Sequence, residues 1–198
     1  MLIEGLCFAL VVGKIRGGKF RCLGQVQIHN WWLFLLSFAI EFGALFAVSA
    51  GIQIAARYSM YLHILSYLIL FIGIMSNREY PSMWVVFLGS FLNFLVITLN
   101  GGAMPISIPG LLRAGLENSA QMISAGGYVT HRPLTEATRL PFLADIFVLP
   151  AGYPFPKVLS VGDILISIGI FLFVQRAMFL EKRKSESHMI RFKYKSRI

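Results

Sequence analysis

Five long apolar segments constrain the fold of this chain more than any other feature of its sequence. They cover residues 1–13, 31–50, 58–76, 82–99 and 160–180. A helix that crosses a bilayer needs about 20 apolar residues, and every segment except the first approaches that length. Only 14% of the residues are charged, whereas soluble domains carry about 25%. The sequence therefore predicts an all-α integral membrane protein, one domain over residues 1–198 with a bundle of four or five transmembrane helices.

The Lys and Arg residues predict how this bundle is oriented. Thirteen of the 18 fall on one side of it and five on the other: 14–30, 77–81 and 176–198 against 51–57 and 100–159. Basic loops stay in the cytoplasm, so we expect a multi-pass protein of the bacterial inner membrane with a cytoplasmic C-terminus. We expect the basic tail, residues 181–198, to contact anionic membrane lipids, and we expect no nucleic-acid partner.

The longest connection, residues 100–159, is predicted to face outward. Its stretch IPGLLRAGLENSAQMISAGG has the pattern of one short helix, with Pro109 near the start and Gly126-Gly127 at the end. The stretch is too polar to cross the membrane, so we expect a re-entrant or interfacial region. Long ordered loops often carry function, and this one is the first place to look for a site.

The chain has two aspartates, Asp145 and Asp163, and they flank a proline-rich loop before the last apolar segment. If residues 146–162 fold back, the two carboxylates meet at the outer membrane surface. Two close carboxylates do not both ionise readily, so one keeps a proton, and the pair can activate water as general base and general acid. The alternative is structural: Asp163 caps the last helix, and Asp145 pairs with Arg139 or Lys157.

Two motifs surround these aspartates, ADIF at 144–147 and SVGDILISIG at 160–169. They resemble the C-terminal part of the lipoprotein signal peptidases (signal peptidase II), whose two catalytic aspartates correspond to Asp145 and Asp163. The resemblance implies an aspartic membrane endopeptidase that acts on a membrane-anchored peptide or lipoprotein without a metal or cofactor. With NGGAMP and TRLPFLAD added, the whole chain resembles an uncharacterised family of bacterial polytopic membrane proteins.

Other polar and glycine residues are candidates for binding a substrate. Asn100, Gly101 and Gly102 form the turn that follows the fourth apolar segment, and adjacent glycines let a ligand approach the backbone. Arg139 and Ser160 precede the two aspartates in sequence and could orient a substrate. Each has a structural alternative, because the turn also serves as a helix stop and an outer arginine also meets solvent or lipid headgroups.

Glu41 lies in the middle of the second apolar segment, where an ionisable side chain is costly. His63 and Asn93 could complete a polar cluster with it. Such a cluster either joins helices by hydrogen bonds or forms a proton path. Three functions therefore stay open: an intramembrane aspartic hydrolase, a non-catalytic protein that scaffolds a membrane-protein partner or binds lipid, and a transporter that uses Glu41.

Overall fold

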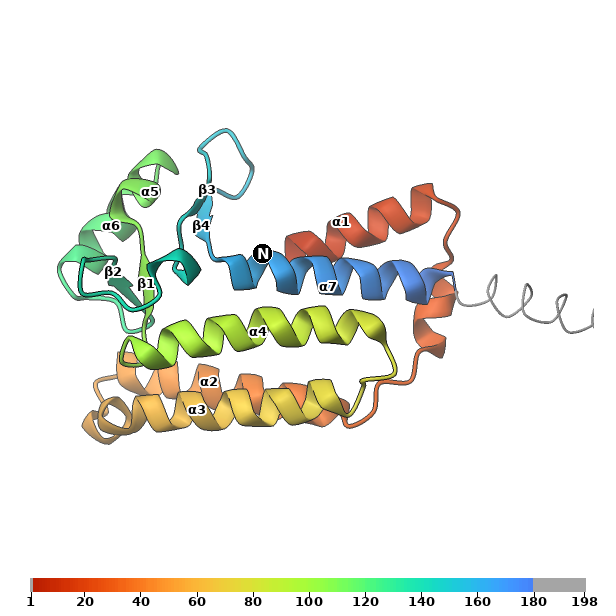
Figure 1. The fold of residues 1–198 in the computed structure, drawn as a ribbon, viewed down its shortest axis with the longest axis horizontal. Helices are drawn as coiled ribbons and strands as arrows, with labels where there is room; N and C mark the ends of the chain where they lie inside the picture. Colours follow the sequence, from red (N-terminus) through yellow and green to blue (C-terminus); the bar gives the residue numbers. More distant parts are fainter. Residues whose placement is uncertain (1, 180–198) are drawn as a thin grey trace, which may run out of the picture.

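Four long helices packed side by side form the body of the molecule. The structure, a computed structural model, describes residues 2–179. Within these residues, four helices are long and apolar enough to cross a membrane: α2 (Trp31–Ser49), α3 (Gln53–Met75), α4 (Pro81–Leu99) and α7 (Val161–Met178). They lie side by side along the long axis (Figure 1). The predicted α-helical membrane bundle is confirmed, and the predicted basic tail lies outside the described residues.

The first apolar segment forms α1 (Leu2–Ile15), which has 14 residues. At 1.5 Å per residue it is about 21 Å long, shorter than a hydrocarbon core of about 30 Å. It packs along α7 (Figure 1), where Ala9 meets Val174 and Met178 in a buried cluster. We therefore describe α1 as an accessory helix beside the four candidate spans. The 3-10 helix η1 (Phe20–Gln25) leads from it towards α2.

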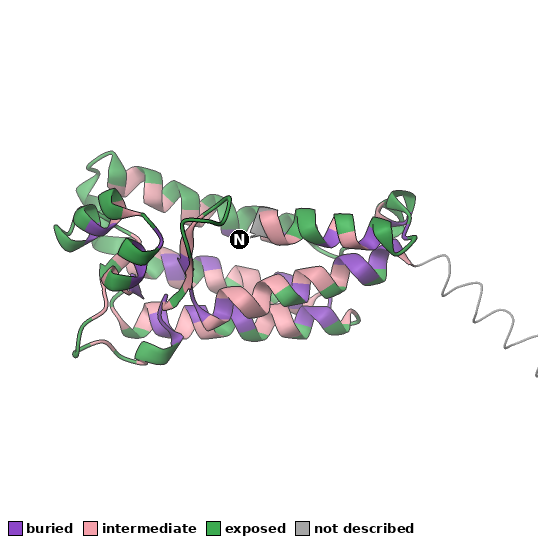
Figure 2. Ribbon diagram, turned by 90° about the horizontal axis from the view of Figure 1, so that it is seen from above, coloured by how far each residue is buried: buried purple, intermediate pink, exposed green. Residues whose placement is uncertain are grey.

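Large apolar side chains cover the outside of the bundle. On α2, Phe38, Phe42 and Phe46 are 64%, 59% and 73% exposed, and Figure 2 shows exposed residues along the helices. Soluble monomers rarely expose apolar surfaces of this extent. The surface therefore fits a protein whose helices are surrounded by lipid.

Glycines let α4 and α7 approach each other closely. A Cβ added at Gly89 on α4 would lie 2.6 Å from the Gly162 carbonyl oxygen on α7, and one added at Gly162 would overlap Oδ1 of Asn93. Small residues are typical where membrane helices pack. This contact fixes the start of α7 beside Asn93.

Residues 100–159, which we call the cap, lie at the end of the bundle where α4 ends and α7 begins (Figure 1). The cap contains β1 (Met104–Ile106), α5 (Ile108–Arg113), α6 (Glu117–Ser124), β2 (His131–Pro133), the 3-10 helix η2 (Pro141–Leu143), β3 (Phe147–Leu149) and β4 (Lys157–Leu159). β1 and β2 are parallel, whereas β3 and β4 are antiparallel. Buried apolar side chains from these elements form a core of their own, so the cap is an ordered unit.

The prediction of a single helix in the cap was wrong. The stretch forms two helices, α5 and α6, because Gly115 between them has a φ of +73°, which ends a right-handed helix. Gly126 has a φ of +74° and follows α6, so the predicted C-terminal stop is confirmed. The short strands of the cap were not predicted.

Candidate functional site

A β-hairpin brings the two aspartates to one place. β3 and β4 pair with Phe147 opposite Leu159, and the Ile146 amide donates to the Leu159 carbonyl at 3.0 Å. Asp145 lies just before this hairpin and Asp163 just after it. The segment 146–162 therefore folds back on itself, which the paired-aspartate hypothesis required, and both aspartates lie where the cap meets α7.

Asp145 is held beside β1 by its backbone. Its amide donates to the Pro105 carbonyl and its carbonyl accepts from the Ser107 amide, both at 2.9 Å. The residue is only 4% exposed. Its Oδ2 lies 3.5 Å from Nε2 of His131 on β2, and its Oδ1 has no hydrogen-bond partner among the described residues.

Burial raises the pKa of the Asp145 carboxyl above its ordinary value. The contact with His131 opposes this change, and the negative charge of Asp163 adds to it. The protonated form of Asp145 is therefore favoured relative to that of an exposed aspartate. A protonated carboxyl has a hydrogen to donate, and Oδ1 is unoccupied by any described partner.

Asp163 is fixed by a network of hydrogen bonds. Ser160 Oγ accepts from the Asp163 amide at 3.0 Å, and Asp163 Oδ2 accepts from the Ser160 amide at 3.4 Å, which is a reciprocal capping box. Asp163 Oδ1 accepts from Nδ2 of Asn93 at 3.0 Å, and Ser160 Oγ donates to Oδ1 of Asn93 at 2.8 Å. Both carboxylate oxygens of Asp163 therefore accept hydrogen bonds from the chain.

The structural alternative for Asp163 holds in a different form: Ser160 is the N-cap of α7, and Asp163, three residues later, completes the capping box. The structural alternative was wrong for Asp145, whose ionic partner is His131. Lys157 lies on β4, and its ammonium group pairs with Glu4 on α1 instead.

Both aspartates line one cavity of about 200 Å³, which we call the inner cavity. Its polar lining comes from three membrane helices, the start of α7 and the cap: Glu41, His63, Asn93, Thr130, His131, Asp145 and Asp163. None of the described Lys or Arg residues lines it. Three carboxylates and two imidazoles therefore share a small space that no described Lys or Arg side chain lines.

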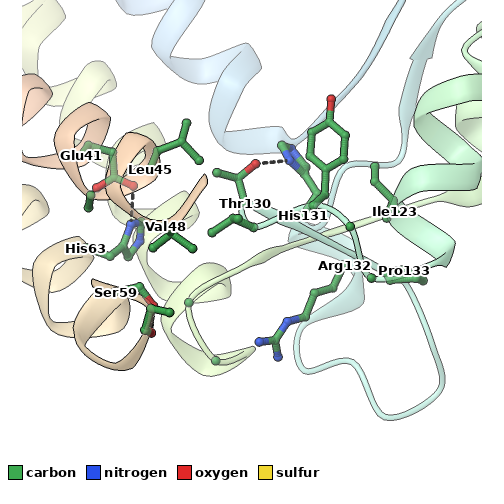
Figure 3. A pocket seen from close by; sticks show the side chains of 18 of the residues that line it. Glu41, Leu45, Val48, Ser59, His63, Ile123, Thr130, His131, Arg132 and Pro133 are labelled. Atoms are coloured by element: carbon green, nitrogen blue, oxygen red, sulfur yellow. Dashed lines mark hydrogen bonds and ion pairs between the residues drawn. The ribbon is translucent and has the colours of Figure 1, made fainter. Parts of the chain in front are cut away.

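A larger cleft of about 680 Å³, which we call the wide cleft, adjoins the inner cavity. Glu41, His63, Gly102, Thr130 and His131 line both. Figure 3 shows Glu41 and His63 on one side of the wide cleft and Thr130 and His131 on the other. The remaining lining combines apolar side chains of α2, such as Leu45 and Val48, with the exposed Arg132 of the cap. The volume suits an organic ligand.

Glu41 forms part of the cluster predicted from the sequence. Its Oε1 lies 2.9 Å from Nδ1 of His63, and its Oε2 accepts from Ser66 Oγ at 2.5 Å. Asn93 bonds to Asp163 instead of Glu41, but it lines the same inner cavity. The bonds from Glu41 to His63 and Ser66 join α2 to α3, so the predicted interhelical hydrogen bonds of Glu41 are confirmed.

Comparison with known proteins places this chain in a family. The model of a family of unknown function, DUF5317, matches residues 25–175. The chain belongs to DUF5317. An uncharacterized protein of Thermotoga maritima is 35% identical over 111 residues, which make up 55% of this chain and 60% of that relative. The chain thus spans about 60% of that relative's length. No solved structure matches.

The expectation of an uncharacterised family is confirmed by membership of DUF5317. The family description and the relative name no activity. The resemblance to lipoprotein signal peptidases therefore stays a prediction.

The predicted binding residues occupy different places in this DUF5317 chain. Gly101 and Gly102 line the wide cleft, and Gly102 also lines the inner cavity. Asn100 bonds to the Arg139 backbone, donating to its carbonyl at 2.8 Å and accepting from its amide at 2.9 Å. Arg139 is exposed and lines neither space, and Ser160 is fully buried in the Asp163 network. The structure therefore places the two glycines, but not the other three side chains, where a ligand in either space would meet them.

The sequence reasoning missed His131 and Thr130 as neighbours of Asp145. Thr130 Oγ1 lies 2.8 Å from Nδ1 of His131, while the other imidazole nitrogen faces Asp145. These residues precede Asp145 by 14 or more positions, and a parallel pairing with β1 brings them together. No periodicity in the sequence indicates that pairing. Between residues 2 and 179, no three His, Cys, Asp or Glu side chains converge to hold a metal ion.

Proposed function

We propose that this DUF5317 protein is an intramembrane aspartic hydrolase that resembles lipoprotein signal peptidase. The observation that carries the proposal is the inner cavity. Asp145 and Asp163 both line it, and none of the described Lys or Arg residues does. Their environments differ, because Asp163 accepts hydrogen bonds at both oxygens while burial favours the protonated form of Asp145. A pair of carboxyl groups with divergent environments is the arrangement that acid–base catalysis needs.

In the proposed reaction, Asp163 takes a proton from a water molecule as the water oxygen bonds to the substrate carbonyl carbon. Asp145 gives its proton to the carbonyl oxygen, so a neutral tetrahedral intermediate forms. The intermediate then collapses: Asp163 passes its proton to the leaving group, and Asp145 recovers a proton from the hydroxyl that becomes the new carbonyl. Both carboxyl groups thus return to their starting states.

The proposed substrate is a membrane-embedded peptide or a lipid-linked molecule that reaches the aspartates through the wide cleft. Apolar side chains of α2 and the backbone of Gly101 and Gly102 line that cleft, so it offers an apolar wall and exposed peptide groups to one ligand. Asn100 would act by fixing this turn to the Arg139 backbone. Ser160 would act by positioning Asp163.

The proposed location is the bacterial inner membrane, and the distribution of basic residues supports an orientation with the cap at the outer face and the C-terminus in the cytoplasm. In that orientation cleavage takes place at the outer face. Membrane lipids and a membrane-anchored peptide or lipoprotein are then the proposed partners.

The test compares the full-length protein with Asp145→Asn and Asp163→Asn in lipid nanodiscs, with Glu136→Gln as a control for an exposed acid. The probes are two quenched fluorogenic peptides, each with one membrane-spanning segment, one of them lipidated at a cysteine. Wild type and the control should cleave a probe, and each aspartate variant should lose at least about 100-fold in rate. Thermal unfolding of each variant separates lost catalysis from lost folding.

The second candidate is a non-catalytic protein that binds lipid or scaffolds a membrane-protein partner. The capping box at Asp163 favours it, because that carboxylate already has a structural role. In the same assay, equal probe turnover by wild type and both folded aspartate variants would reject the hydrolase. The same variants expressed in cells should then leave membrane-protein and lipoprotein processing unchanged.

A further inference from the structure

Glu41, His63 and Ser66 form a second acid–base group that the proposed hydrolysis does not use. His63 is 7% exposed, and its Nδ1 faces Oε1 of Glu41 at 2.9 Å. Its other ring nitrogen, Nε2, is buried and has no hydrogen-bond partner among the described residues. A buried imidazole with one nitrogen oriented by a carboxylate and the other unpaired is arranged to exchange a proton with a third group.

This group lies between the two spaces. Glu41 and His63 line both the inner cavity and the wide cleft. The Glu41 side chain is 44% exposed, whereas that of His63 is 8% exposed. In Figure 3 the two side chains face each other across the contact of α2 with α3, at the wall of the cleft. A path through His63 and Glu41 therefore runs from a buried site to an open one.

Ser66 lets Glu41 hold an extra proton without breaking a hydrogen bond. Ser66 Oγ lies 2.5 Å from Oε2 of Glu41 and 2.8 Å from the His63 carbonyl oxygen, and a hydroxyl has one hydrogen to donate. When Glu41 is ionised, the hydroxyl donates to Oε2. When Oε2 is protonated, it donates to Ser66 Oγ, and the hydroxyl turns to the carbonyl. In both of these states, in which His63 has not yet passed on a proton, Nδ1–H donates to Oε1.

We propose that Glu41, His63 and Ser66 form a proton relay that links the inner cavity to the wide cleft. A proton from the inner cavity bonds to Nε2 of His63, while the Nδ1 proton passes to the facing Oε1 of Glu41, so that Nδ1 then accepts from Oε1–H. Glu41 then releases that proton to water in the cleft. The reverse transfer restores the starting tautomer of His63. The relay rests on the proposed function at one point: the group in the inner cavity with which it exchanges protons is the Asp145 carboxyl of the proposed hydrolase.

The unpaired atoms in the inner cavity support this role. Asp145 Oδ1 and His63 Nε2 are both buried and unpaired among the described residues, and their side chains line the same cavity. A cavity of about 200 Å³ has room for water to join them, since a single buried water needs far less space. The Tyr67 ring packs against that of His63, and the other titratable and charged groups that line the two spaces are Asp163, His131, Asp145, Tyr128 and Arg132.

The matched variant for the test is His63→Asn. The asparagine amide can replace Nδ1–H as a donor to Glu41, but it has no counterpart of Nε2 and cannot pass a proton on. His29→Asn is the control, because His29 also bonds to a glutamate, Glu79, but in an exposed pair away from both spaces. Equal thermal unfolding of the two variants establishes that both fold.

The measurement is time-resolved infrared absorption of the Asp145 carboxyl after a pH jump, with the full-length protein in nanodiscs and the band assigned by Asp145→Asn. In His63→Asn and Glu41→Leu, the Asp145 band should respond about tenfold more slowly than in wild type and His29→Asn. Equal rates in all four proteins would overturn the relay. This readout needs no substrate, so the relay is judged even if the probe peptides are not cleaved.

A second measurement uses NMR of ¹⁵N-labelled histidine in the same samples. The relay predicts that His63 carries its proton on Nδ1 at neutral pH and that this preference is lost in Glu41→Leu. A His63 that carries its proton on Nε2 in wild type would also overturn the relay.

Discussion

The side chain of Asn93 on α4 bonds to two residues at the start of α7, Ser160 just before the helix and Asp163 in its first turn. Its Nδ2 donates to Asp163 Oδ1 at 3.0 Å, and its Oδ1 accepts from Ser160 Oγ at 2.8 Å. The amide thus uses both of its ends, so the orientation of its oxygen and nitrogen is defined by its partners. Asn93 therefore ties the position of the candidate base Asp163 to the packing of α4 against α7.

Replacing Asn93 by leucine should destabilise the protein by about 1–3 kcal/mol, because the buried Ser160 Oγ and the half-buried Asp163 Oδ1 each lose a partner. The measurement is thermal unfolding in detergent micelles. Leu88→Ala is the control, since Leu88 is 49% exposed on the same helix. An Asn93→Leu protein as stable as the control would show that the network adds nothing to the fold.

Gly162→Ala should separate α4 from α7. The new Cβ would overlap Asn93 Oδ1 and lie 2.6 Å from the Gly89 carbonyl oxygen, so backbone has to move, at a cost of about 1–3 kcal/mol. Gly43→Ala on α2 is the matched control, because nothing lies within 4 Å of its Cβ position. Thermal unfolding of both variants checks the prediction, which fails if the two substitutions have the same effect.

Asp145 should make the stability of the protein depend on pH. Burial raises its pKa in the folded protein, so folding favours the protonated form. Its contribution to the free energy of unfolding is therefore fully present below the ordinary aspartate pKa of about 3.9 and is lost as the pH rises through the folded value. Asp145→Asn cannot ionise and should remove this component.

The check is the unfolding temperature of wild type and Asp145→Asn between about pH 4 and pH 7, a range that starts at the ordinary aspartate pKa. Wild type should lose stability relative to the variant as pH rises. Repeating both measurements with His131→Gln removes the titration of the imidazole that lies 3.5 Å away. A difference that grows in favour of wild type with rising pH contradicts the assignment.

The membrane bundle was predictable because hydropathy, length and basic loops act locally along the chain. The four candidate spans differ from their predicted limits by a few residues, apart from the earlier start of α3 at Gln53. The cap was harder to predict, since its strands have three residues each and are defined by their partners. Parallel pairing of Met104 with His131 depends on a fold that encloses 26 intervening residues and leaves no periodic signal.

The candidate site also contains residues that the sequence indicates and residues that only the fold of the cap brings together. The two aspartates stood out from composition, whereas the folding back between them was only a condition of the hypothesis that they meet. His131 was not assigned to Asp145, because their contact depends on the strands of the cap. Asn100 was a candidate either for binding substrate or for a structural role in the turn, and its amide bonds to the Arg139 backbone. A polar residue at a turn does not reveal from sequence whether its partner is a ligand or the chain itself.

Glu4 on α1 and Lys157 on β4 form an ion pair that ties the accessory helix to the foot of the hairpin. Reversing one charge, as in Glu4→Lys, places two ammonium groups together and should loosen α1 from α7. The double variant Glu4→Lys with Lys157→Glu should restore the contact. A reporter is available nearby, since a Cβ at Gly5 would lie 3.7 Å from Cβ of Ser167, within the range of a disulfide.

The measurement is the rate of disulfide formation between Gly5→Cys and Ser167→Cys, in a background with Cys7→Ser. Crosslinking should be fast with the native pair, slower in Glu4→Lys and fast again in the charge-reversed double variant. Recovery in the double variant distinguishes the ion pair from any other effect of the substituted residue. Equal rates in all three proteins would mean that α1 is held by its apolar contacts with α7, such as Ala9 against Val174 and Met178, and that the ion pair is incidental.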